Sequence, residues 1–381
     1  MFYLIYKWFH DPDTILRFLR LFRYQPFRAM CAAATGFLFV LALMPWFIRL
    51  MRRKGVREQA RHYSQLDSGR KSAVPTMGGL VLVAATLVSA GLWCDPTNRF
   101  VLIVLLVGLG GGLLGLGDDL AKFRRRGSDR GLSRKAKYAA QIALGLLLGV
   151  ALLSEAVSPI AFEDVRGSVY LPFIKWGFYL GWANVVLVVL FMIISTNSVN
   201  LADGMDGLAT VPAIFVFLVL AVFAYIIGHP GHAPFLQFFP RIDPLGYEVN
   251  QHLVGAGELA VLCCACAGAC AGFLWYNAFP ATVMMGDTGS LALGALLGSV
   301  AVLIRQEGIF IIAGGVFIIE IASAFVQDYI GLKLLGRRVL FRAPFHSSLL
   351  HRGISENKVT VRLWILSAAF AVIALAMLKL R

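Results

Sequence analysis

The chain has 381 residues, of which 59% are hydrophobic and only 15% are charged, and its formal net charge is +14. Its mean hydropathy of +0.75 excludes an ordinary soluble globule and predicts an all-α polytopic integral membrane protein. The basic residues gather in short segments between apolar runs, so membrane topology explains them better than binding to nucleic acid does. Binding of anionic lipid or of a phosphate-bearing substrate stays open beside that explanation.

The N-terminal segment, residues 1–27, mixes aromatic side chains with Lys7, Arg17, Arg20 and Arg23. It lacks the small-residue cleavage site of a signal peptide. Its composition instead predicts an amphipathic helix that lies at the membrane interface and leads into the first span.

Ten apolar runs follow this segment, and about 20 apolar residues are enough to cross a bilayer. They predict ten membrane-spanning helices near 29–50, 77–94, 99–117, 136–155, 172–195, 207–228, 257–276, 288–304, 309–330 and 360–379. No internal repeat is visible, so we expect one transmembrane domain over residues 1–381.

Lys and Arg alternate between loops in a way that predicts orientation. The loops after the first, third and ninth predicted helices are rich in basic residues, whereas the loops at 95–99, 155–171, 228–255 and 305–308 are poor in them. The positive-inside rule therefore places the odd-numbered loops in the cytoplasm and both termini outside. The basic residues of segment 1–27 favour the opposite orientation, but the loop pattern is consistent along the chain.

Four of the six cysteines lie inside the apolar run 257–276 among Ala and Gly. No His or carboxylate accompanies them, so we interpret them as small packing residues and predict neither a metal site nor a disulfide there.

The most polar stretch between two spans is 197–208, in which Asn200, Asp203 and Asp206 recur every third residue. Helical spacing of three places each beside the next. Unpaired polar groups are costly in lipid, so these side chains are expected at a membrane surface or in a wet cavity. A polar connector between two helices is the simpler alternative.

Three further carboxylates stand at predicted inner ends of helices. Asp118 and Asp119 are adjacent, and they repel each other unless a cation or a proton lies between them. Alternatively, one of them caps a turn and the other meets solvent. Asp287 precedes a predicted helix and could simply be its N-cap. Carboxylate oxygens beside phosphates are also the ligands that Mg²⁺ takes.

Cationic and neutral donors accompany these carboxylates in the inner loops. Pro75 can begin a helix, and free backbone N–H groups there, with Thr76 and Lys71, form a candidate phosphate seat. The remaining polar candidates of the inner loops are Lys122, Lys137, Asn277 and His346. Carboxylates for a metal beside ammonium groups for anions suit phosphoryl transfer, in which catalysis is mainly positioning and charge neutralisation.

Four sequence blocks together resemble the polyprenyl-phosphate N-acetylhexosamine-1-phosphate transferase superfamily. They are Gly117-Asp118-Asp119, Asn200–Gly207, Gly286–Ser290 and the loop that carries His346. Within the superfamily, the chain is most similar to the bacterial phospho-N-acetylmuramoyl-pentapeptide transferases. That similarity is carried by Lys71–Gly79, Gly131–Lys137 and Glu356–Arg362, and it covers nearly the whole chain.

The resemblance implies a Mg²⁺-dependent enzyme of the bacterial inner membrane with its active site in the cytoplasm. Such an enzyme transfers phospho-MurNAc-pentapeptide from UDP-MurNAc-pentapeptide to undecaprenyl phosphate, and it releases UMP and forms lipid I. It serves peptidoglycan and cell-wall biogenesis, and through them cell shape and cell division. The oligomeric state stays open, a homodimer included.

The resemblance also assigns roles to matching positions. It implies catalytic roles for Asp118, Asp119, Asp287 and His346, with Asp287 as the metal ligand. It implies substrate contacts for Lys71, Thr76, Lys122, Lys137, Asn200, Asp203, Asp206 and Asn277. A phosphate monoester has a second pKa of about 6, so the lipid phosphate is largely ionised, and a positioning role for Asp118 would suffice in place of a base.

Two departures from the family pattern concern the nucleotide pocket. Ser347 and Ser348 follow His346 where the family has further histidines, and Met284 replaces an aromatic residue. Three alternatives also remain: a sibling transferase that uses UDP-GlcNAc, an ion-coupled transporter and a catalytically inactive scaffold. The blocks at Lys71–Gly79 and Gly131–Lys137 argue against the first, and the location of the carboxylates at loop edges argues against the second.

Overall fold

The computed structural model describes residues 1–9, 15–56, 74–124, 131–174, 176–236, 238–242, 248–250 and 252–379. Lys71, a predicted substrate contact, lies outside these residues. The described part is mainly helical and has very few strand residues, which confirms the all-α class. Its strands form two antiparallel hairpins, β1 (Ser168–Val169) with β2 (Phe178–Tyr179) and β3 (Pro240–Ile242) with β4 (Glu248–Asn250).

Nine helical segments of the described residues are long and apolar enough to cross a membrane, which confirms a polytopic membrane protein. They are α2 (Gln25–Arg53), α5 (Arg99–Arg124), α6 (Arg134–Leu153), η2 (Gly181–Ala183) with α8 (Asn184–Ala202), α9 (Thr210–Ile227), α11 (Glu258–Asn277), α12 (Gly286–Leu303), α14 (Gly315–Phe325) with η3 (Val326–Leu334), and α16 (Glu356–Ala376) with η4 (Met377–Lys379). The predicted second span corresponds to α4 (Gly79–Trp93), whose 15 residues reach only about 22 Å.

Two predicted spans differ from the observed helices. The helix predicted over 172–195 begins only at Asn184, because β2 and the turn η2 (Gly181–Ala183) precede it and Gly181 has a φ of 52°. The helix predicted over 309–330 is divided at Gly314 into α13 (Glu307–Ala313) and α14. The adjacent glycines Gly314 and Gly315 lower helix propensity at that point, and Gly315 packs against the ring of Phe370 in α16.

The prediction for the N-terminal segment was also too simple. Residues 1–27 contain two short helices, α1 (Phe2–Phe9) and η1 (Ile15–Arg23), rather than one amphipathic helix. Phe2 and Phe22 pack on the ring of Trp93 at the end of α4. This aromatic contact holds the segment against the bundle.

Helix α12 is the centre of the bundle, and 94% of its residues are buried. Glycines on α5 allow the two helices to approach closely: a Cβ on Gly111 would lie 2.7 Å from the Ala295 Cβ, and a Cβ on Gly115 would lie 2.1 Å from the Asp287 carbonyl oxygen. Small residues at such a crossing are typical of membrane helix pairs. The close approach brings the end of α5 beside the start of α12.

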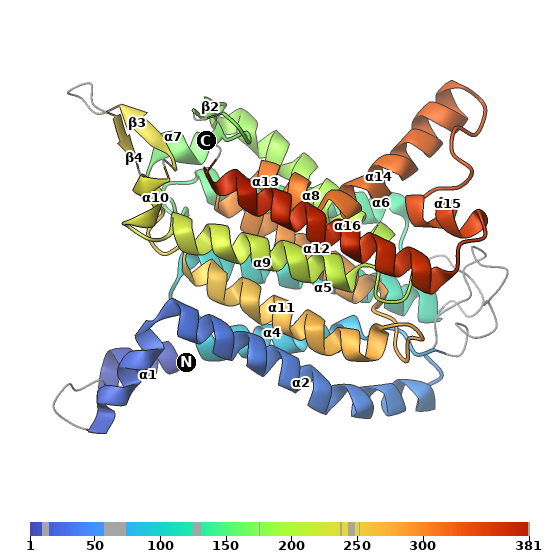
Figure 1. Ribbon diagram of the computed structural model, residues 1–381, viewed down its shortest axis with the longest axis horizontal. Helices are drawn as coiled ribbons and strands as arrows, with labels where there is room; N and C mark the ends of the chain where they lie inside the picture. Colours follow the sequence, from blue (N-terminus) through green and yellow to red (C-terminus); the bar gives the residue numbers. More distant parts are fainter. Residues whose placement is uncertain are drawn as a thin grey trace.

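Different elements lie at the two ends of the bundle. Both chain termini, the two hairpins and α10 (His232–Phe235) lie at one end, whereas α15 (Phe345–His351) and the start of α16 lie at the other (Figure 1). We call these the terminal end and the loop end. Helix α14 leans away from the rest of the bundle at the loop end (Figure 1).

Candidate active site

Three buried aspartates meet at the loop end of the bundle. Asp118 and Asp119 lie near the end of α5, and Asp287 lies in the first turn of α12. One carboxylate oxygen from each lies within 4.8 Å of the others. Three carboxylates this close need positive charge among them.

Two lysines supply that charge. The Nζ atom of Lys122 lies 2.7 Å from Asp118 Oδ2 and 3.1 Å from Asp287 Oδ1. The Nζ atom of Lys137, from the first turn of α6, lies 2.9 Å from Asp118 Oδ2 and 2.8 Å from Asp287 Oδ2. The aspartates are buried, but the lysine side chains are 28% and 26% exposed. Each lysine therefore links buried carboxylates to solvent.

The third aspartate has a structural role. Asp119 Oδ2 accepts hydrogen bonds from the Thr288 backbone N–H at 2.9 Å and the Thr288 hydroxyl at 2.6 Å, and Oδ1 accepts from the Asp287 backbone N–H at 3.1 Å. Asp119 thus caps α12 from a neighbouring helix. The alternative in which one aspartate caps the next turn and the other meets solvent is wrong, because Asp119 caps α12 and both side chains are buried. Asp287 as an N-cap is also wrong, because Met285 holds the cap position and the Asp287 carboxylate faces the lysines.

The central stretch reaches the aspartates through α12. Asn200, in the last turn of α8, donates from Nδ2 to Ser290 Oγ at 2.8 Å, one turn from Asp287. Asp203 follows the same helix as its C-cap and is buried. The stretch therefore ends a helix and turns at the site rather than lying wholly in a connector.

Asp206 and Asn277 hold two loops together. Asp206 Oδ2 accepts from the Ala281 backbone N–H at 3.0 Å. Asn277 accepts from the Gly207 N–H at 3.1 Å and the Thr210 hydroxyl at 3.0 Å, and it donates to the Val283 carbonyl at 3.0 Å. These bonds use the amide of Asn277 inside the protein, so a direct contact between Asn277 and substrate stays a prediction.

The last two predicted residues approach the site from separate elements. Thr76 lies against Gly286, where a Cβ would meet the Thr76 hydroxyl oxygen at 3.2 Å. His346, in α15, is buried, and its Nδ1 lies 3.0 Å from Oε2 of Glu320 in α14. Sequence reasoning missed Glu320, although a glutamate inside an apolar run is a signal of function in membrane helices.

The donor set at the aspartates fits a hard divalent cation. Carboxylate oxygens are the ligands such ions prefer, and Asp118 and Asp287 both direct oxygens at positive charge. Both carboxylate oxygens of Asp119 accept hydrogen bonds from the start of α12, which makes Asp119 a poorer direct ligand for a cation. Asp118 is also held by the Leu132 N–H at 2.7 Å. The carboxylates are therefore fixed in place.

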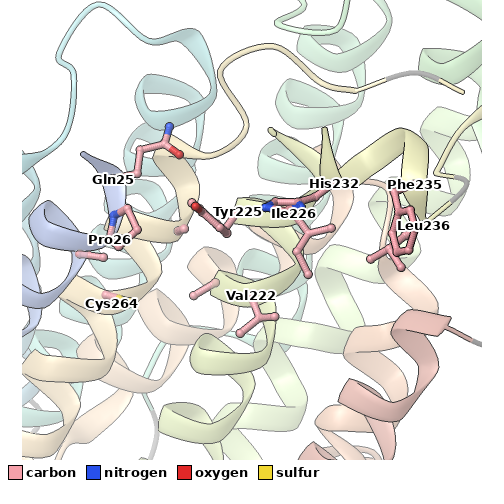
Figure 2. A pocket seen from close by; sticks show the side chains of 12 residues that line it. Gln25, Pro26, Val222, Tyr225, Ile226, His232, Phe235, Leu236 and Cys264 are labelled. Atoms are coloured by element: carbon pink, nitrogen blue, oxygen red, sulfur yellow. The ribbon is translucent and has the colours of Figure 1, made fainter. Parts of the chain in front are cut away.

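A separate cavity of about 610 Å³ lies at the terminal end (Figure 2). Its lining is almost wholly apolar and comes from α2, α9, α10 and α11, with residues Gln25, Pro26, Ala29, Ala221, Val222, Tyr225, Ile226, His232, Phe235, Leu236, Ala260 and Cys264. None of these described lining residues carries a carboxylate or ammonium group, so they do not provide the chemistry of the aspartate–lysine cluster.

Comparison with known proteins shows the class to which this chain belongs. Residues 101–305, which include the three aspartates, match the family described as glycosyl transferase family 4. The chain is also similar, over 98% of its length, to the phospho-N-acetylmuramoyl-pentapeptide-transferase of Methylacidiphilum infernorum, with 39% identity and 99% of that protein covered. The proteins of that name from Desulfotalea psychrophila and Rhodopseudomonas palustris are 38% and 37% identical, over 99% and 98% of this chain and 100% and 99% of their own length. The chain belongs to the phospho-N-acetylmuramoyl-pentapeptide-transferase family, which confirms the resemblance drawn from its motifs.

Proposed function

We propose that the protein transfers phospho-MurNAc-pentapeptide from UDP-MurNAc-pentapeptide to undecaprenyl phosphate, giving lipid I and UMP for peptidoglycan synthesis. The observation that carries the proposal is the cluster of Asp118, Asp287, Lys122 and Lys137 at one end of a membrane-helix bundle. It combines ligands for a divalent cation with cations for phosphate oxygens, in a place that a lipid substrate and a soluble nucleotide can both reach.

The reaction is a displacement at phosphorus. An oxygen of the lipid phosphate forms a bond to the β-phosphorus of the UDP-sugar, the bond from that phosphorus to the bridging oxygen breaks, and UMP leaves with that oxygen. Charge on the phosphate oxygens must be neutralised throughout. Mg²⁺, held by Asp287 and Asp118, would supply part of that neutralisation and fix the diphosphate.

The two lysines supply the rest. Lys122 and Lys137 each bridge Asp118 and Asp287. Their partial exposure leaves the ammonium groups within reach of an incoming diphosphate, toward which a flexible side chain can turn. Asp118, fixed by the Leu132 N–H and by both lysines, is suited to hold these cations in position. A proton-abstracting role for it is not required, because the lipid phosphate is already largely ionised at neutral pH.

The proposed membrane arrangement follows from the basic loops. The loop end would face the cytoplasm, where nucleotide sugars are made, and both termini would lie outside. The proposed nucleotide and sugar contacts are Asn200, Asp203, Asp206, Asn277 and His346.

One assay tests the reaction and the choice of substrate. The purified protein is incubated with undecaprenyl phosphate, Mg²⁺ and either UDP-MurNAc-pentapeptide or UDP-GlcNAc, and UMP is measured. We expect UMP with the first nucleotide sugar and little with the second. The reverse preference would assign the chain to the UDP-GlcNAc transferases, and no UMP with either would refute the transferase proposal.

A further inference from the structure

Glu320 is a fully buried carboxylate in α14, within a segment apolar enough to cross a membrane. Ionisable side chains in such segments are costly and are retained mainly where they have a functional partner. The partner here is His346. Glu320 has no role in the proposed displacement at phosphorus, so its burial and its contacts with His346 need another physical reason.

Glu320 holds His346 at two points. Its Oε1 accepts a hydrogen bond from the His346 backbone N–H at 3.2 Å, and its Oε2 lies 3.0 Å from the ring Nδ1. When the carboxylate is ionised it can only accept hydrogen bonds, and the proton between the two side chains then belongs to Nδ1. The same contact fixes the tautomer of a histidine wherever the ring's second nitrogen is used for chemistry.

The opposite edge of the ring is held by Gly204, which belongs to the loop after α8. A Cβ on Gly204 would lie 2.8 Å from His346 Nε2 and 3.0 Å from Cε1. Any side chain at this position would therefore displace the ring. His346 is confined between the Glu320 carboxylate and the Gly204 backbone, and its Nε2 is directed at the loop that joins Asp203 to Asp206.

We propose that Glu320 is a positioning residue that fixes the ring orientation and the Nδ1–H tautomer of His346, so that Nε2 is held toward the loop that carries the proposed substrate contacts Asp203 and Asp206. The assignment rests on the proposed transferase function, since only then does His346 act on a substrate. Glu320 contacts His346 and takes no direct part in the reaction. Removal of the carboxylate behind a metal-bound histidine typically costs about 10–100-fold in activity, and we expect the same range for the carboxylate that holds His346.

The first test is kinetic. Glu320→Gln retains size and hydrogen bonding, but its amide can either accept from Nδ1 or donate to it, so the tautomer is no longer fixed. We expect turnover to fall about 10–100-fold. Ser323→Ala is the matched control: Ser323 lies one turn away, and its hydroxyl donates to the Glu320 backbone carbonyl at 2.8 Å rather than to the carboxylate. It should stay within about twofold.

The second test uses Gly204→Ala, which disturbs the same ring from the other side. Both changes act through His346, so the double variant Gly204→Ala/Glu320→Gln should be little less active than the less active of the two single variants. A double-mutant cycle measures this coupling. Gly204→Ala combined with Ser323→Ala should be additive. Full additivity in the first pair would refute positioning through a shared ring.

The third test does not depend on transferase activity. With ring-¹⁵N histidine, the His346 signals are assigned among the chain's seven histidines by their loss in His346→Gln. We expect an Nδ1-protonated ring in the wild type and a tautomer mixture in Glu320→Gln. An unchanged His346 signal in Glu320→Gln would overturn the inference. If the wild type made no UMP, the transferase proposal would fail, and these spectra would still decide whether Glu320 orients the ring.

Discussion

The two ends of the bundle each bury a network of opposite charges, but the networks differ in balance and in access. At the terminal end, Arg28 pairs with Glu258, both side chains are buried, and the pair adds bonds to the Trp93 carbonyl and the Asp95 N–H. At the loop end, three aspartates face two partly exposed lysines. The first network is one cation to one anion and is enclosed in protein. The second has one carboxylate in excess and is open to solvent.

This difference separates a structural charge network from a reactive one. A buried, matched ion pair gains nothing from a ligand. Loss of one of its two partners leaves the other charge uncompensated. A cluster with an excess carboxylate and reachable ammonium groups can take up a cation and an anion together, as a metal–diphosphate complex would require. The expected experimental consequences are therefore opposite: stability at the terminal end and activity at the loop end.

The largest contrast predicted between the ends is their accessibility from outside the cell. In a background that lacks the six native cysteines, Val254→Cys at the terminal end should react with an impermeant thiol reagent in spheroplasts, because Val254 is 74% exposed. Ser355→Cys at the loop end should be shielded and should react only after the membrane is permeabilised. Ser355 precedes α16 without a side-chain capping bond, so its replacement is mild. Labelling in the reverse pattern would invert the orientation and remove the cytoplasmic site.

The next largest effect is expected at Asp287. Asp287→Asn keeps the shape of the side chain but removes the negative charge that faces both lysines. Turnover should fall by about 10³-fold or more, since loss of a charge that orients a phosphoryl group costs several kcal/mol of transition-state stabilisation. UMP release per folded protein measures it. Asp95→Asn, at the terminal end, is the control and should leave turnover within about twofold. Normal turnover in Asp287→Asn would exclude its role as a metal ligand.

The converse prediction concerns the terminal end. Glu258→Gln leaves the buried Arg28 guanidinium without its counter-charge, and breaking a buried pair in this way costs about 3–5 kcal/mol. Thermal unfolding in detergent should therefore shift to lower temperature while UMP release per folded molecule is unchanged.

The double variant Arg28→Met/Glu258→Gln serves as the matched comparison. It removes both charges, so it should regain much of the stability lost in Glu258→Gln. If the double variant were no more stable than the single one, or if either variant lost activity before it lost stability, the two networks would not be separable in the way proposed.

The contrast also explains what could be predicted from the sequence. Apolar runs and basic loops gave the helices and the relative location of the carboxylates, because hydropathy and charge act locally along the chain. The shift from 172 to Asn184, and the break at Gly314, were missed because glycines interrupt runs that remain largely apolar. Hydropathy does not register such a change of backbone conformation.

The sequence indicated carboxylates that the structure brings together, but not the contacts that each of them makes. Asp118, Asp119 and Asp287 were identified together, yet only the packing of α5 on α12 makes Asp119 a cap for the neighbouring helix. Glu320 was not considered, because its partner lies 26 residues further along the chain. Neither role can be read from spacing, since each depends on contacts between separate helices.

The smallest predicted effect tests the different roles of Asp119 and Asp287 at the loop end. Thr288→Val removes the hydroxyl that donates to Asp119 at 2.6 Å but leaves the two backbone N–H donors of the cap in place. Loss of one hydrogen bond to a charged group should lower the free energy of unfolding by about 1.5–3 kcal/mol. Turnover should fall only severalfold, because Asp287 and both lysines keep their contacts. Thermal unfolding and UMP release on the same preparation measure both quantities. A loss of turnover as large as that of Asp287→Asn, without a loss of stability, would instead make Asp119 a direct participant in the reaction.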